Sequence, residues 1–228
     1  MSSFGARTIP RATLLRLQNE LRELKSNVDA GFVVFQPNET NFLSWKVAIF
    51  GAPDTVYQGG YFVANLSFPD NYPFAPPVLK FTNPPLHPNV YPDGTVCISI
   101  LHSAQNEATS GEADNERWNI TQSVRTVLLS IISMLNEPNL SSPANVDAAR
   151  MFRDWKENKN TAYTDQINVQ IEESKAVAST DGISVPLTQE QYLKQSEDAK
   201  KASDAAAKAS EMDLTNDPID FTDDNQDE

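Results

Sequence analysis

The sequence predicts an α+β domain: a four-stranded antiparallel meander sheet covered by an N-terminal helix and C-terminal helices. Strand-like runs rich in Val, Phe and Tyr are grouped before residue 82, and helical patterns dominate after residue 120. Separate groups of strands and helices are typical of α+β folds. The connections between the strand-like runs are short, and parallel strands would need crossovers of a dozen residues or more. An antiparallel meander is therefore expected.

Each expected element has its own local signal. The first helix, over residues 10–25, is predicted by leucines at helical spacing: Leu14, Leu17, Leu21 and Leu24. Turn signals separate the four expected strands, which span residues 32–36, 42–50, 60–68 and 78–81. Eight prolines between Pro69 and Pro92 leave little regular structure there but stiffen the path of the chain. Three further helices are expected over residues 121 or 123 to 135, 145–158 and 161–178.

Cysteine usage and hydropathy limit the class of protein. Cys97 is the only cysteine, so no internal disulfide can form, and no Cys/His spacing suggests a metal site. The first ten residues are polar, which is unlike a signal peptide. The longest apolar-rich run, residues 127–135, is too short to cross a bilayer. These features predict a cytoplasmic and nuclear protein that has no membrane partner.

The negative charge is concentrated at the C-terminal end. The formal net charge is −13, and residues 211–228 contain eight acidic residues and no basic one. We therefore expect a catalytic domain over residues 8–180 and an acidic, largely disordered tail over residues 181–228. Phosphate repulsion argues against nucleic acid as a partner. The tail either serves solubility or binds a basic protein surface.

Cys97 is the candidate nucleophile. A lone cysteine is usually an inert core residue, but this one follows a stiff, turn-rich segment that also carries Asn89. The Asn89 amide is suited to bracing a loop or to binding a developing oxyanion. Another segment, leading into a helix, supplies Ser142 and Asp147. His87 lies among prolines, where a structural hydrogen bond is its commoner role, so Cys-His hydrolysis is not favoured. A thiol that receives an activated acyl group and passes it to an amine fits better.

The run His87-Pro88-Asn89, with Cys97 eight residues after the Asn, resembles the active-site signature of ubiquitin-conjugating enzymes. The resemblance covers residues 14–174. Further motifs follow in the order found in that fold: Trp45, Tyr57-Gln58-Gly59-Gly60, Tyr72-Pro73-Phe74, Trp118 and Glu137-Pro138-Asn139. It implies that Cys97 accepts ubiquitin as a thioester from an activating enzyme, which uses ATP upstream, and passes it to lysine. No bound cofactor is implied.

The resemblance extends to the acidic-loop subclass of that family. An insertion between Cys97 and Trp118 carries Glu107, Glu112, Asp114 and Glu116. This subclass includes the cell-cycle type that works with cullin-RING (SCF) ligases and the type that serves endoplasmic-reticulum-associated degradation. Residues 182–192 and the acidic end resemble the tail of the cullin type. There the tail is implied to dock on a basic cullin surface. The endoplasmic-reticulum role remains an alternative.

The resemblance also assigns individual roles. Asn89 would stabilise the loop, the tetrahedral intermediate, or both, while Asp147 and Ser142 would position or deprotonate the incoming lysine. The acidic loop would favour ubiquitin chains of the proteasome-targeting linkage. Ligase binding is implied for Phe74, Trp118 and Ile120, and activating-enzyme docking for Arg11, Arg16 and Arg22.

Two departures from the family pattern are visible. Ile120 replaces a common proline, which predicts a less rigid ligase-binding loop, and Asn106-Glu107 weakens the charge of the acidic loop. Two other functions remain open: a non-catalytic scaffold with this fold, and a carrier of a ubiquitin-like modifier. A scaffold needs neither Cys97 nor Asn89, and the acidic insertion favours ubiquitin itself.

Overall fold

The computed structural model describes residues 9–26, 31–103, 116–195, 197–198 and 201, and it confirms the predicted α+β class. None of the helices in these ranges is long and apolar enough to cross a membrane. The helices are α1 (Arg11–Ser26), α2 (Val124–Asn136), α3 (Val146–Lys156) and α4 (Ala162–Thr180). The strands are β1 (Phe32–Val34), β2 (Ser44–Phe50), β3 (Tyr61–Ser67) and β4 (Val78–Phe81), and two short 3-10 helices are η1 (Glu39–Asn41) and η2 (Ser99–Leu101).

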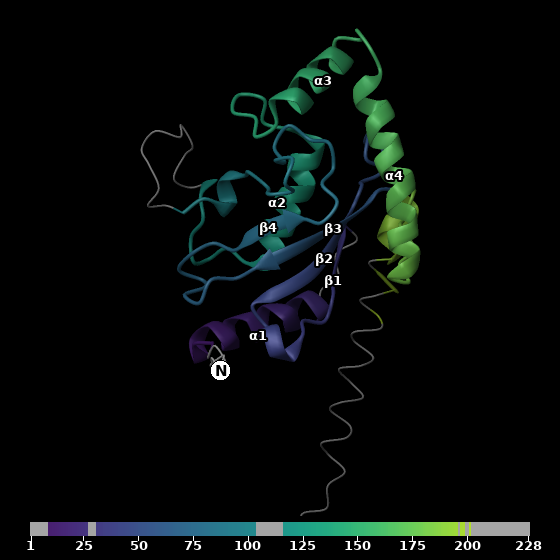
Figure 1. The fold of residues 1–228 in the computed structure, drawn as a ribbon. Coiled ribbons are helices and arrows are strands. Elements are labelled where there is room, and N and C mark those ends of the chain that lie inside the picture. Colours follow the sequence, from purple (N-terminus) through teal and green to yellow (C-terminus); the bar gives the residue numbers. More distant parts are fainter. Residues whose placement is uncertain (1–8, 27–30, 104–115, 196, 199–200, 202–228) are drawn as a thin grey trace, which may run out of the picture.

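The four strands form an antiparallel meander in the order β1-β2-β3-β4 (Figure 1). Two expected strand boundaries were wrong by two residues, and both ends of β3 by one. β2 starts at Ser44 rather than at residue 42, because Asn38 caps η1 through its side-chain oxygen and the chain enters the sheet only afterwards. β1 ends at Val34, although the Phe35 N–H still donates to the Lys46 carbonyl at 3.0 Å.

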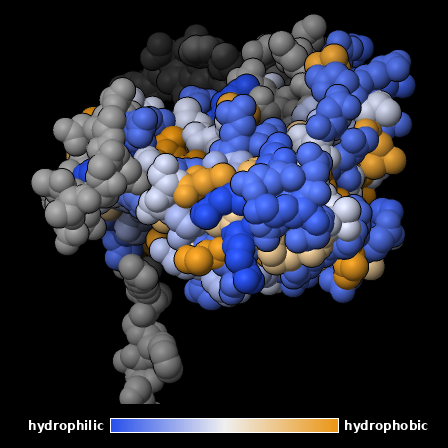
Figure 2. Space-filling view, turned by 90° about the horizontal axis from the view of Figure 1, so that it is seen from above, coloured by the Kyte–Doolittle hydropathy of each residue, from blue (hydrophilic) through white to orange (hydrophobic). Residues whose placement is uncertain are grey.

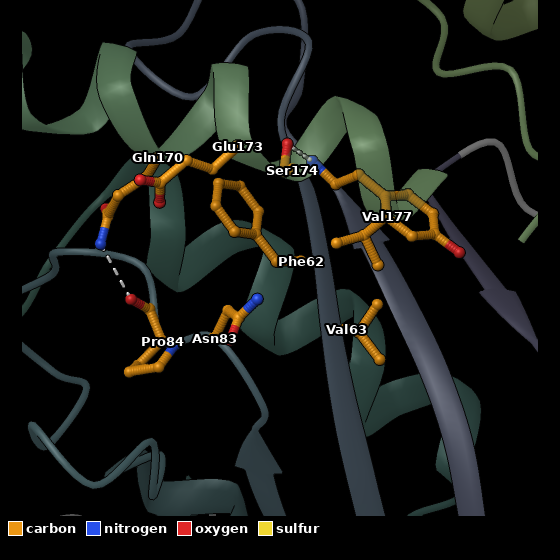
Figure 3. Close-up of a pocket in the computed structure, with 9 residues that line it drawn as sticks. Phe62, Val63, Asn83, Pro84, Gln170, Glu173, Ser174 and Val177 are labelled. Carbon is orange, nitrogen blue, oxygen red and sulfur yellow. Dashed lines mark hydrogen bonds between the residues drawn. The ribbon is translucent and has the colours of Figure 1, made fainter. Parts of the chain in front are cut away.

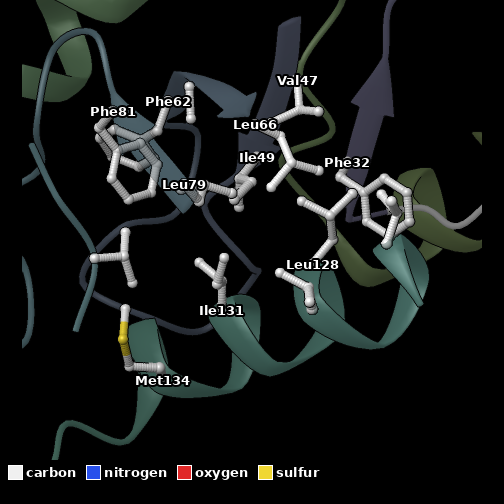
Figure 4. Close-up of a cluster of buried hydrophobic side chains, with 14 of the residues drawn as sticks. Phe32, Val47, Ile49, Phe62, Leu66, Leu79, Phe81, Leu128, Ile131 and Met134 are labelled. Carbon is white, nitrogen blue, oxygen red and sulfur yellow. The ribbon is translucent and has the colours of Figure 1, made fainter. Parts of the chain in front are cut away.

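The main core lies between α2 and one face of the sheet (Figure 4). α2 begins at a capping box in which Ser123 and Thr126 bond to each other's backbone. Leu128 and Ile131 point from α2 towards the sheet and are fully buried there with Ile49, Leu66 and Leu79. We call this side of the sheet the inner face. The packed layer fixes the position of β4, from which the chain continues to Cys97.

Glu20 on α1 links three parts of the fold. Its carboxylate is buried and accepts hydrogen bonds from the Arg16 guanidinium at 2.5 Å and from the Tyr72 hydroxyl at 2.7 Å. The second carboxylate oxygen accepts from the Val124 N–H at 2.7 Å, at the N-terminus of α2, where the helix dipole favours a negative charge. Contact with these donors compensates the cost of burying the charge.

The opposite, outer face of the sheet is covered by the end of α4 and by residues 181–195, which we call the C-terminal strap (Figure 1). Asp181 accepts from Lys46 at 2.5 Å and from the Tyr61 hydroxyl at 2.8 Å. Apolar strap residues, among them Ile183, Val185 and Tyr192, pack with Phe50. The domain boundary at residue 180 stays a prediction, and residues 202–228 lie outside the described ranges.

Substitution Glu20→Ala is expected to lower the free energy of unfolding by about 2–4 kcal/mol, because it leaves the buried Val124 N–H and Tyr72 hydroxyl without their acceptor. The matched control is Glu23→Ala, an exposed glutamate on the same helix, which should change it by less than about 0.5 kcal/mol. Urea denaturation of both variants measures the difference. Equal values for the two variants would contradict the bridging role of Glu20.

Candidate active site

Cys97 lies on the irregular segment between β4 and η2, residues 82–98, which we call the active-site segment. It is not part of a disulfide, and its side chain is partly exposed. The segment doubles back through a turn at Gly94, where φ is +91° and a Cβ would lie 2.2 Å from the Phe81 carbonyl oxygen. Only glycine fits this position. The turn lets the Cys97 N–H donate to the Asn89 carbonyl at 3.0 Å.

The Asn89 side chain is 2% exposed and pairs with one backbone unit. Its Nδ2 donates to the Asn139 carbonyl and its Oδ1 accepts from the Asn139 N–H, both at 2.8 Å. Of the two roles left open by the sequence, loop bracing is the one this geometry shows directly. The paired bonds tie the active-site segment to the loop that leads from α2 to α3.

His87 performs the structural role expected for it. Its Nδ1 accepts from the Asn89 N–H at 2.9 Å, and its Nε2 lies 3.0 Å from the Met134 carbonyl at the end of α2. A carbonyl can only accept, so Nε2 carries the proton and the ring is neutral. Burial lowers the pKa of His87 to about 4, although the bond to Met134 acts in the opposite direction.

Two side chains that lie near the Cys97 thiol were not predicted from the sequence. His102 Nε2 lies 3.8 Å from the Cys97 sulfur, brought there by the turn of η2. Tyr91 also interacts with Cys97: the pKa of its hydroxyl is raised, first by the negative charge of the thiolate and then by burial. The sequence placed His102 five residues after the cysteine, but only the 3-10 turn shows that the two side chains meet.

Ser142 and Asp147 are both exposed, on the loop before α3 and in the first turn of α3. Asn145 caps α3 by accepting from the Ala148 N–H, and its own N–H donates to the Pro88 carbonyl at 2.9 Å. The start of α3 is thereby attached to the active-site segment. Seen from the α3 end of the molecule, the surface is mainly hydrophilic with separate apolar residues (Figure 2).

The expected ligase-binding residues differ in exposure. Phe74 is 76% exposed and Ile120 is 55% exposed, whereas Trp118 is 3% exposed. The Trp118 indole N–H donates to the Pro73 carbonyl at 2.8 Å. Trp118 therefore supports the loop that carries Phe74, while the side chains of Phe74 and Ile120 are exposed to solvent.

The remaining expected site residues lie on α1 and in the acidic loop. Arg11 and Arg22 are exposed on α1, whereas Arg16 is half-buried and also donates to the Gln122 carbonyl at 2.9 Å. Of the acidic-loop residues, Glu116 is described and exposed. The other three, Glu107, Glu112 and Asp114, lie outside the described residues.

The fold and the site define a class: a transferase domain with one partly exposed thiol on a braced loop. The family model described as "Ubiquitin-conjugating enzyme" matches residues 16–167. "Ubiquitin-conjugating enzyme E2 13" from Arabidopsis thaliana is 47% identical over 146 residues, 64% of this chain and 86% of its own length. "Ubiquitin-conjugating enzyme E2 G2" from Homo sapiens is 49% identical over 144 residues, 63% of this chain and 87% of its own.

The chain belongs to the ubiquitin-conjugating enzyme family. It is accordingly a ubiquitin-protein transferase, and family membership supports transfer of ubiquitin through a thioester. Membership also implies three kinds of protein partner: ubiquitin, the ubiquitin-activating enzyme and RING-type ligases. The resemblance seen in the motif around Cys97 is thus confirmed at the level of the family.

Stability should fall as the pH is lowered from about 6.5 towards 4, because the unfolded chain takes up a proton on His87 that the folded chain excludes. The full effect is on the order of 3 kcal/mol at pH 4. The contribution of the neutral His87 ring to stability is fully present above the pKa of His87 in the unfolded chain. It is lost as the pH falls towards the pKa of His87 in the folded chain. NMR titration of the His87 ring in the folded protein checks this directly, with His102→Gln to assign the signals. Protonation near pH 6.5 would contradict it.

Substitution Asn89→Ala should lower the free energy of unfolding by about 1–3 kcal/mol, because the Asn139 N–H and carbonyl lose their partners. The same variant should slow ubiquitin discharge from the charged enzyme. Asn139→Ala is the matched control, since Asn89 bonds to the backbone of residue 139, which that variant keeps. Slower discharge with unchanged stability would show an oxyanion role without bracing.

Proposed function

We propose that Cys97 is the residue that carries ubiquitin. The thiolate would attack the ubiquitin carbonyl held as a thioester on the activating enzyme, the new thioester would form on Cys97, and the activating enzyme's cysteine would leave as a thiolate. ATP is consumed upstream, so no bound cofactor is required. The proposal is supported by the partial exposure of the Cys97 thiol. It is also supported by the hydrogen bonds of Asn89 and His87, which hold the backbone of the active-site segment in place. A fixed nucleophile lowers the entropic part of the barrier.

Discharge requires an unprotonated lysine amine. Asp147 and Ser142 are our candidates for orienting this amine, and Asp147 for accepting its proton. The amine nitrogen would attack the thioester carbonyl, an isopeptide bond would form, and the Cys97 thiolate would leave. Support comes from the exposure of both side chains and from the bond between Asn145 and Pro88, which attaches their segment to that of Cys97.

We further propose membership of the acidic-loop subclass and action with a cullin-RING ligase in the cytoplasm and nucleus, including the cell-cycle role. The observation that carries this proposal is the C-terminal composition, with eight acids and no base in residues 211–228. Such a segment favours a basic protein surface and rapid, electrostatically steered association. With the acidic loop, including Glu107, Glu112 and Asp114, it would support chains of the proteasome-targeting linkage.

Two exposed surfaces suit the other partners. Phe74 and Ile120 would contact the RING domain, with Trp118 supporting the loop. The exposed guanidinium groups of Arg11 and Arg22 would meet an acidic surface of the activating enzyme. Arg16 is engaged with Glu20 and Gln122, so its contribution to docking should be smaller.

Replacing the eight acids of residues 211–228 by Asn or Gln should lower the association rate with a cullin-RING complex about tenfold or more at low salt. The difference should shrink as salt is raised, because screening weakens the attraction. Stopped-flow association measures both rates, and a shuffled tail with the same charge is the control. Equal rates for the neutral and native tails would contradict cullin docking and favour the endoplasmic-reticulum alternative.

A further inference from the structure

Gln170 on α4 holds the first part of the active-site segment, residues 84–86, from the side (Figure 3). Its Nε2 donates to the Pro84 carbonyl at 3.1 Å, and its Oε1 accepts from the Leu86 N–H at 2.8 Å. One amide side chain thus binds both a carbonyl and an N–H of the same short stretch. This arrangement fixes the direction of the backbone as well as its position.

The Leu86 backbone is satisfied by side chains rather than by a strand. Its carbonyl accepts from the Tyr57 hydroxyl at 2.8 Å and lies 3.2 Å from the Tyr163 hydroxyl, while its N–H bonds to Gln170. Residues 84–89 lie outside the named strands. A buried backbone group that loses its partner costs free energy, so each of these side chains restrains the path of the segment.

A cavity of about 260 Å³ lies next to Gln170. Figure 3 shows Asn83 and Pro84 on one side of it, Gln170 and Glu173 on another, and Phe62 between them. Close packing normally holds a segment even after a hydrogen bond is lost. Here the cavity borders Pro84, so packing on that side is reduced. The two bonds from Gln170 therefore carry more of the restraint.

The restraint reaches the thiol through consecutive contacts. Leu86 precedes His87, whose ring accepts from the Asn89 N–H, and the Asn89 carbonyl in turn accepts from the Cys97 N–H. We propose that Gln170 is a positioning residue for ubiquitin transfer, acting on Cys97 through residues 84–89. It lies beyond residues 16–167, the part of the chain that matches the family model.

The test uses the full chain, charged with ubiquitin and then discharged to free lysine in a single turnover. Gln170→Met keeps the length of the side chain and removes both hydrogen bonds. The control is Gln166→Met, which changes an exposed glutamine one turn earlier on α4. We expect Gln170→Met to lower the discharge rate at saturating lysine about tenfold relative to the control. The lysine concentration at half the maximal rate should not change.

Gln170→Glu keeps an acceptor for the Leu86 N–H but turns an oxygen towards the Pro84 carbonyl in place of the donor, so its discharge rate should also be lower than that of the control. Hydrogen exchange gives a second readout: the amides of Asn89 and Cys97 should exchange faster in Gln170→Met, with those of β2 and β3 unchanged. Discharge within twofold of the control would overturn the proposal. So would faster exchange throughout the sheet.

Discussion

The active site depends on hydrogen-bond partners for the backbone of residues 84–89, a proline-rich stretch that lies outside the strands of the sheet. Prolines cannot donate to a ladder of strand hydrogen bonds, so side chains must supply the partners. The His87 ring bonds to the Met134 carbonyl at the end of α2 and to the Asn89 N–H in its own segment. The Asn89 side chain bonds to the N–H and the carbonyl of residue 139. Cys97 is held in turn by the Asn89 carbonyl. The position of the thiol therefore follows from interactions that it does not itself make.

This division between a braced interior and an exposed edge suits an enzyme that meets several protein partners in succession. The inner face of the sheet and α2 form a packed core, which supports the loops and contains none of the proposed catalytic side chains. Phe74 and Ile120 are exposed, whereas Trp118 is buried and bonds to the Pro73 carbonyl next to Phe74. Loops on a rigid scaffold can bind partners without a cost in refolding. On the outer face, the C-terminal strap extends the fold beyond α4.

Sequence patterns predicted the fold class and every strand and main helix, because hydrophobic periodicity and turn residues act locally. They also placed Cys97, Asn89 and His87 on one stiff segment. They could not show that Asn89 pairs with residue 139, because that contact joins positions 50 apart in the chain. The hydrogen bonds by which Glu20 links α1 to Tyr72 and α2, and those by which Gln170 holds residues 84–86, were not predicted for the same reason. Each of these two residues has a polar side chain on an amphipathic helix, and only tertiary packing shows that it is buried or half-buried.

We propose that the sulfur of the braced Cys97 side chain is the atom that carries ubiquitin. Charging with activating enzyme, ATP and ubiquitin, followed by non-reducing electrophoresis, tests it most directly. We expect a band heavier by one ubiquitin that thiol reagents remove, and in Cys97→Ser a band that resists thiols but is cleaved by alkali. A charged band that persists in Cys97→Ala, or no charged band in the native protein, would contradict it.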